Sequence, residues 1–202
     1  VVPRLTAEIL QPSESQTLFT SMVPKGESSG GGGGGSASWS DVIPTIRHIY
    51  KSDPTELAHP PVLTHLLVAD FDSAEGSSLL SVASRHLKKA GVKTRIGLLH
   101  HGDASSTPGP ISIALQTALD SFSLNTAKLL VIKIQRNADF QAFIRSTDST
   151  PPEGLSVHGV DLAEFNAEIL APSEEILRAI KLHREFARSE LNLAAQGASA
   201  AV

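Results

Sequence analysis

A strand, a helix and a second strand follow one another with short connections in residues 62–99. The first strand starts at Val62 and is a near-continuous apolar run, typical of a strand buried on both faces. The helix carries a stripe of leucine, valine and alanine, and Gly91 ends it before a second apolar strand that reaches Leu99. Parallel strands need a crossover of this kind, so the segment predicts a right-handed βαβ unit and an α/β fold.

The rest of the chain divides by composition around this unit. Residues 26–38 contain six consecutive glycines, which predict a flexible loop because they have no side chains to bury. Ser40 is placed to cap a helix over residues 40–51. Helical periodicity then predicts a helical subdomain over residues 110–172 and a long amphipathic helix over residues 173–195. We expect one domain of 202 residues, cut from a longer protein because the chain starts with valine.

Composition excludes several functions. The chain has no cysteine, which rules out disulfides, thiolate metal sites and thiol redox chemistry. Its 17 basic and 21 acidic residues give a net charge of −4, so no electrostatic footprint for nucleic acid is expected. No apolar run approaches the roughly 20 residues of a membrane span, and no membrane partner is expected.

Two short motifs could carry chemistry. Asp70 and Asp72 flank Phe71 directly after the first strand, and two carboxylates there would suit a divalent cation in a small metal-dependent transferase. The simpler interpretation is that Asp72 caps a helix and Asp70 accepts hydrogen bonds in the turn. His100 and His101 lie in a segment expected to be an exposed loop, and adjacent side chains on extended backbone point apart. We therefore predict no catalytic residues, no bound metal and no cofactor in this chain.

The last helix has an unusually wide apolar face. Its apolar residues spread over about half of its circumference, whereas a surface helix usually buries a stripe of somewhat over 100°. One interpretation is a helix packed between two layers of its own domain. The other is that part of the face binds, or shields, a surface for another chain. The residues concerned are Ile176, Ala179, Ile180, Leu182, Phe186, Ala187, Leu191 and Leu193.

Several segments in register resemble one family. They are Val1-Val2-Pro3-Arg4-Leu5, Val68-Ala69-Asp70-Phe71-Asp72-Ser73, Thr94-Arg95-Ile96-Gly97, the stretch ISIALQTALDSFSLNTAK from Ile111, and Gly159-Val160-Asp161-Leu162. In this order they resemble the folding-sensor region of the UDP-glucose:glycoprotein glucosyltransferases, and within it the third thioredoxin-like domain. The match spans nearly the whole chain, except residues 14–59, where a lineage-specific insertion is expected.

The resemblance implies more than the residues alone. It implies a thioredoxin-like central sheet with an inserted or appended helical subdomain, in the lumen of the endoplasmic reticulum. The expected partners are misfolded N-glycoproteins, met through exposed apolar surface, and the neighbouring domains of the parent protein. The parent enzymes use UDP-glucose and a divalent cation in a separate catalytic domain, so Asp70 and Asp72 are not carried over as catalytic.

The resemblance also locates where redox chemistry would be. A thioredoxin places its CxxC motif at the turn after a central strand, where the helix N-terminus lowers a thiol pKa. The corresponding turn here is Phe71-Asp72-Ser73-Ala74, without sulfur. Two hypotheses follow. The domain is either a non-catalytic module that helps to recognise misfolded glycoproteins, or a structural spacer that positions the other sensor domains.

Overall fold

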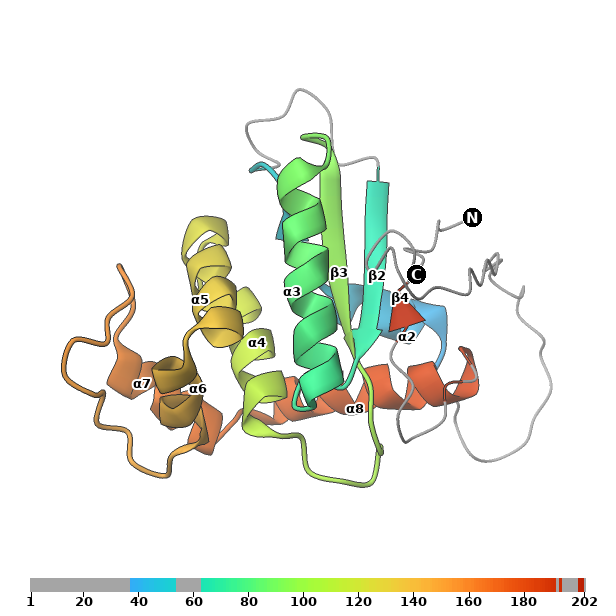
Figure 1. Cartoon of the computed structure of the whole chain (residues 1–202). Helices are drawn as coiled ribbons and strands as arrows, with labels where there is room; N and C mark the ends of the chain where they lie inside the picture. The colour runs from blue at the N-terminus through green and yellow to red at the C-terminus, as the bar shows by residue number, and fades with distance from the viewer. Residues whose placement is uncertain (1–36, 54–62, 192, 194–199, 202) are drawn as a thin grey trace.

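A mixed sheet forms the centre of the molecule (Figure 1). The structure is a computed structural model that describes residues 37–53, 63–191, 193 and 200–201. Within these residues the sheet has four strands in the spatial order β1-β3-β2-β4. They are β1 (Arg47–Tyr50), β2 (Leu63–Ala69), β3 (Thr94–His100) and β4 (Ala200–Ala201). β2 and β3 are parallel, whereas β1 pairs with β3, and β4 with β2, in antiparallel orientation.

The predicted βαβ unit is confirmed. Helix α3 (Ala74–Lys89) connects β2 to β3 and runs along the strands in Figure 1. The parallel register places Leu63 opposite Thr94 and Ala69 opposite His100. β2 is buried on both faces along its second half, as its continuous apolar run indicates. The chain is therefore an α/β protein.

The helix predicted over residues 40–51 is wrong. Helix α2 (Trp39–Val42) is a single turn that continues into the 3₁₀ helix η1 (Ile43–Thr45), and the chain then forms β1. Ile49 lies opposite Ile96 of β3 and is buried against it. A short isolated helix is only marginally stable. Pairing with β3 gives the N–H and C=O groups of this segment partners in the sheet, so the segment forms a strand although its apolar spacing favours a helix.

The predicted flexible loop over residues 26–38 is described only at its last two residues. There the prediction is wrong, because Ala37 is buried and Ser38 is the N-cap of α2, with Asp41 completing a capping box. Residues 26–36 lie outside the described residues.

Within the described residues, five helices follow β3. Helices α4 (Pro110–Ser121), α5 (Leu124–Arg136), α6 (Ala138–Arg145) and α7 (Leu162–Leu170) occupy the segment predicted to be helical. Helix α8 (Glu174–Ser189) is shorter than the predicted helix over residues 173–195. Figure 1 shows α8 crossing the carboxyl ends of β2 and β3, with α6 and α7 packed together to one side.

Two hydrophobic clusters lie against the sheet. The large cluster contains Leu67 and Ile96 from the strands, together with side chains of α3 to α7. The small cluster contains Leu66, Val68 and Leu99 with side chains of α2 and α8. The alternation along β2 therefore separates two cores on opposite faces of one sheet.

Candidate functional site

The turn between β2 and α3 is the one that the resemblance equates with the cysteine-bearing turn of a thioredoxin. Ser73 is the N-cap of α3, and its Oγ accepts a hydrogen bond from the Gly76 N–H at 2.9 Å. The same hydroxyl donates to the Asp70 carbonyl oxygen at 2.7 Å, and Asp70 Oδ1 accepts from the Asp72 N–H at 3.1 Å. A Cβ on Gly76 would lie 1.8 Å from the Asp70 carbonyl oxygen, so this tight turn requires glycine there. The turn is thus closed by its own hydrogen bonds.

Asp72 caps a helix other than the one it precedes. Its Oδ1 accepts from the Ile111 N–H at 2.9 Å and its Oδ2 from the Ser112 N–H at 3.3 Å, both in the first turn of α4. The N-cap residue of α4 is Gly109, which has no side chain to fill this role. A Cβ on Gly109 would lie 2.3 Å from the Asp72 carboxylate. The structure therefore divides the two capping roles, Ser73 serving α3 and Asp72 serving α4.

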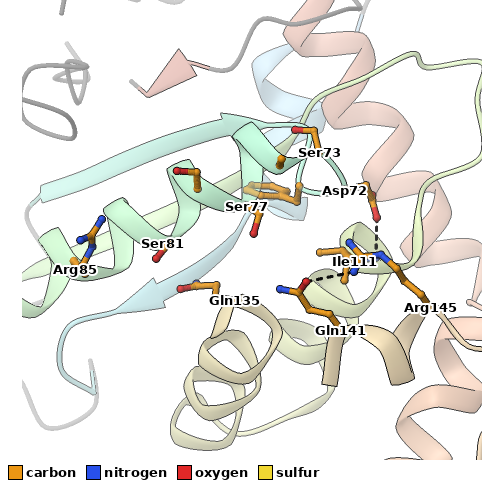
Figure 2. Close-up of a pocket in the computed structure, with 12 residues that line it drawn as sticks. Asp72, Ser73, Ser77, Ser81, Arg85, Ile111, Gln135, Gln141 and Arg145 are labelled. Atoms are coloured by element: carbon orange, nitrogen blue, oxygen red, sulfur yellow. Dashed lines mark hydrogen bonds between the residues drawn. The ribbon is translucent and has the colours of Figure 1, made fainter. Parts of the chain in front are cut away.

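A cleft of about 620 Å³ opens beside this turn (Figure 2). Figure 2 shows Ser77 and Ser81 of α3 on one side and Gln135 of α5 on the other, with Arg85 and Arg145 at opposite ends. The lining residues are Phe71, Asp72, Ser73, Ala74, Ser77, Ser78, Ser81, Arg85, Ile111, Gln135, Gln141 and Arg145. The periodicity of α3 indicates a solvent-facing side, but only the packing of α5 and α6 turns that side into a cleft.

A chain of buried polar side chains lies at the end of β3. The rings of His100 and His183 stack at 5.5 Å between centroids and 8° between planes. His100 Nε2 lies 3.2 Å from Gln116 Oε1, and His183 Nε2 lies 3.0 Å from Thr45 Oγ1. Because the Thr45 hydroxyl donates to the Val42 carbonyl oxygen, it accepts from His183 Nε2–H. The prediction that His100 and His101 lie in an exposed loop is wrong, since both are buried and His100 belongs to β3.

Burial keeps these histidines neutral. It lowers the pKa of His100 to about 4, and the nearby Arg184 acts in the same direction, whereas the hydrogen bond with Gln116 acts against it. Burial, together with His100 and Arg47, lowers the pKa of His183 well below its usual value. A neutral His183 accepts the long, 3.5 Å hydrogen bond from the His100 N–H at Nδ1 while donating from Nε2. The imidazole rings of His100 and His183 therefore stack in their neutral form.

Arg184 is also buried, at 4% exposure, although helical periodicity places it on the polar half of α8. Its Nη1 donates to the carbonyl oxygens of Asp103 at 3.0 Å and Ser106 at 2.8 Å. Burial lowers the pKa of Arg184, and Asp70, Asp72 and Asp103 act against that shift. The guanidinium thereby fastens the loop after β3 to α8, an arrangement that no motif in the sequence indicates.

The eight apolar residues singled out on the predicted last helix are buried or partly buried, and Leu191 and Leu193 lie beyond the end of α8. Five of them are buried, namely Ile176, Ala179, Ile180, Phe186 and Ala187. Leu182, Leu191 and Leu193 are partly buried at the border of the small cluster. Ile176 and Ile180 belong to the large cluster, whereas Phe186 and Ala187 belong to the small one. The wide apolar face thus packs against two cores of the domain itself, and a role in binding or shielding clients stays a prediction.

The two carboxylates of the Asp70-Phe71-Asp72 motif hold backbone N–H groups, as the simpler interpretation predicts. Within the described residues there is no group of three or more histidine, cysteine or acidic side chains arranged to hold a metal ion. No helix in the same part of the chain is long and apolar enough to cross a bilayer.

Comparison with known proteins agrees with this architecture. A family model described as a thioredoxin-like domain matches residues 36–202. No curated protein and no solved structure matches the chain. The family model covers most of the sequence and coincides with the strand-helix-strand unit and the helices around it. The chain belongs to the family of thioredoxin-like domains.

Proposed function

We propose that this chain is a non-catalytic thioredoxin-like domain of a glycoprotein folding sensor of the UDP-glucose:glycoprotein glucosyltransferase type. In this role it contributes to the recognition of misfolded N-glycoproteins in the lumen of the endoplasmic reticulum. The sequence segments that resemble this family, in order and in register, support the parent assignment. The family of thioredoxin-like domains supports the fold.

One observation carries the non-catalytic part of the proposal. At the turn where thiol chemistry would occur, the Ser73 hydroxyl and the Asp72 carboxylate both cap helices. Neither group is left to attack a substrate, and the sequence contains no cysteine to exchange a disulfide. The position that is reactive in a thioredoxin is structural in this domain.

The border of the small cluster is the surface we assign to client contact. Trp39 lies edge-on to Phe186 with 4.5 Å between ring centroids, and its ring is only partly buried. Leu182, Leu191 and Leu193 are partly buried beside it. Misfolded clients share exposed apolar side chains but no sequence, so a non-directional apolar contact is the recognition that suits them.

The spacer hypothesis has its own supporting observation. The most apolar part of α8 is buried, with Ile180 and Phe186 both fully inaccessible. Among the described residues the exposed large apolar side chains belong to separate elements. They are Ile43, Leu63, Val92, Leu129 and Leu170. A domain with this exterior can position its neighbours without touching clients.

Binding of a denatured glycoprotein to the full chain tests the two hypotheses. We expect the wild-type chain to bind the denatured form and not the native form, and Leu182→Gln combined with Leu191→Gln to weaken that binding severalfold. Leu170→Gln is the matched control, because Leu170 is an exposed leucine on α7. If the Leu182/Leu191 variant and the Leu170 control bind equally well, the client contacts another surface of the domain. If the wild-type chain does not bind, the spacer hypothesis is favoured.

A further inference from the structure

The cleft beside the β2–α3 turn has polar groups without partners. The hydroxyls of Ser77, Ser78 and Ser81 make no hydrogen bond to any described residue. Gln135 donates from Nε2 to Ser84 Oγ at 2.9 Å, but its Oε1 is buried and accepts no hydrogen bond from the residues that the structure describes. A buried carbonyl oxygen without a donor costs free energy unless a ligand or water supplies one. The cleft therefore presents hydroxyl donors and acceptors together with an amide acceptor.

The two ends of the cleft are positively charged. Arg85 has no hydrogen bond or ion pair within the described part of the chain, and Arg145 Nη1 donates only to the Gln141 amide oxygen at 3.3 Å. Among the lining residues Asp72 is the only carboxylate, and it is bound to the first turn of α4. Two guanidinium groups thus face one cleft that has a single carboxylate among its lining residues, and guanidinium binds phosphate and carboxylate through paired N–H groups.

The lining selects the class of ligand. An apolar ligand would find little contact, because Phe71 and Ile111 are almost completely covered by their own neighbours. A neutral sugar would leave both guanidinium groups unpaired and would find no exposed aromatic ring on which to stack. A simple inorganic anion would leave the serine hydroxyls and the Gln135 carbonyl without partners. A ligand with both an anionic group and several hydroxyls pairs with all of these groups.

We propose that this cleft binds a small hydroxyl-rich anion of the sugar phosphate class. A guanidinium group of Arg85 or Arg145 holds the phosphate, while Ser77, Ser81 and the Gln135 carbonyl hold the sugar hydroxyls. The site lies on the α3 face of the sheet and does not depend on client contact at Trp39.

Titration of the full chain with a hexose 6-phosphate, followed by calorimetry and by amide chemical shifts, tests the proposal. We expect saturable binding that shifts the amide signals of Ser77, Ser81 and Gln135. Inorganic phosphate should bind more weakly, and the neutral hexose should not bind measurably. Equal binding of inorganic phosphate would overturn the role of the hydroxyls, and equal binding of the neutral hexose would overturn the role of the arginines.

Variants locate the site. Arg85→Gln and Arg145→Gln should together weaken hexose phosphate binding by about tenfold or more, the usual effect of removing charged hydrogen bonds. Arg136→Gln is the matched control, since Arg136 is an exposed arginine at the end of α5 outside the cleft. Ser81→Ala, which preserves helix formation, should weaken binding by a smaller factor. Unchanged binding in the cleft variants, or no binding by the wild type at millimolar ligand, would contradict the proposal.

Discussion

The described residues cover the two faces of the sheet to very different depths. On one face α3 packs against β2 and β3, and α4 to α7 extend the same large cluster outward. On the other face, among the described residues, α2 and the second half of α8 cover the strands, and several apolar side chains there are partly buried. Helix α8 contributes to both cores, through Ile180 on one side and Phe186 on the other. A helix that joins two clusters needs a wider apolar face than a helix that covers one.

Removing a ring from the large cluster should have the largest effect. Phe165 is almost fully buried and lies 5.8 Å from the Phe122 ring and 6.4 Å from the Phe140 ring, between centroids. Phe165→Ala should lower the free energy of unfolding by about 3–5 kcal/mol, because it leaves a cavity that dense packing cannot close. Urea unfolding followed by circular dichroism measures this. A loss below about 1 kcal/mol would show that the large cluster repacks readily.

A phenylalanine-to-alanine substitution in the small cluster tests whether the structures on the two faces of the sheet unfold together. Phe186→Ala should cost about 3 kcal/mol, and Trp39, the only tryptophan, should report the loss of its ring contact by a red shift in fluorescence. We expect amide exchange to increase in the second half of α8 and less in α4 and α5. Leu170→Ala, at an exposed side chain on α7, is the control. Equal exchange increases throughout would mean that the clusters form one cooperative unit.

Acid should weaken the contact between α8 and the end of β3. The folded pKa of His100 is about 4, below its unfolded value of 6.5, so the unfolded chain binds more protons between these values. Stability is therefore fully present above pH 6.5 and decreases as the pH falls towards 4, by an amount on the order of 3 kcal/mol from His100 alone. His183 acts in the same direction, and the charged groups acting on the pair are Arg184 and Arg47.

Urea unfolding at several pH values measures this dependence. His183→Gln should flatten the slope of unfolding free energy against pH, because one of the two stacked imidazoles is removed. His158→Gln, at an exposed histidine, should leave the slope unchanged. A wild-type slope of zero between pH 4 and 6.5 would contradict the neutral stacked pair.

Removing the cap that Asp72 provides for α4 should lower the free energy of unfolding by a smaller amount. Asp72→Ala removes the acceptor of the Ile111 and Ser112 N–H groups and should cost about 1–2 kcal/mol. Gly109→Ala should cost a similar amount, because its Cβ would displace the same carboxylate. Thermal unfolding of both variants and of the double variant measures this. Costs that add fully in the double variant would show that the two positions act independently.

The smallest effect is expected at the surface of α8. Lys181 and Glu185 are one turn apart, with 4.0 Å between Nζ and Oε1, and Lys181 is exposed. Lys181→Ala should change the free energy of unfolding by about 0.5 kcal/mol or less, because water screens such pairs. Thermal unfolding at low and high salt measures it. A larger loss would mean that the outer side of α8 has a structural role.

Much of the fold is predictable from the sequence, because its strongest signals are local. The βαβ unit and the helices after β3 follow from periodicity and from residue types at helix ends. The strand at Arg47–Tyr50 does not, since only its pairing with β3 makes that conformation favourable. The cleft cannot be predicted from the sequence either, because Gln135 and Arg145 join the serines of α3 in one lining only after α5 packs against α3 and α6 packs against α5.

By itself the sequence determined that this chain is an α/β domain without thiol chemistry, since both conclusions depend on residue types and short-range patterns. Tertiary structure decided which partners the polar and apolar groups found. In the folded chain the Asp72 carboxylate caps α4, and His183 and Arg184 are buried. The apolar face of α8 contacts two separate hydrophobic clusters. These are contacts between residues far apart in the chain, and side-chain packing in three dimensions selects them.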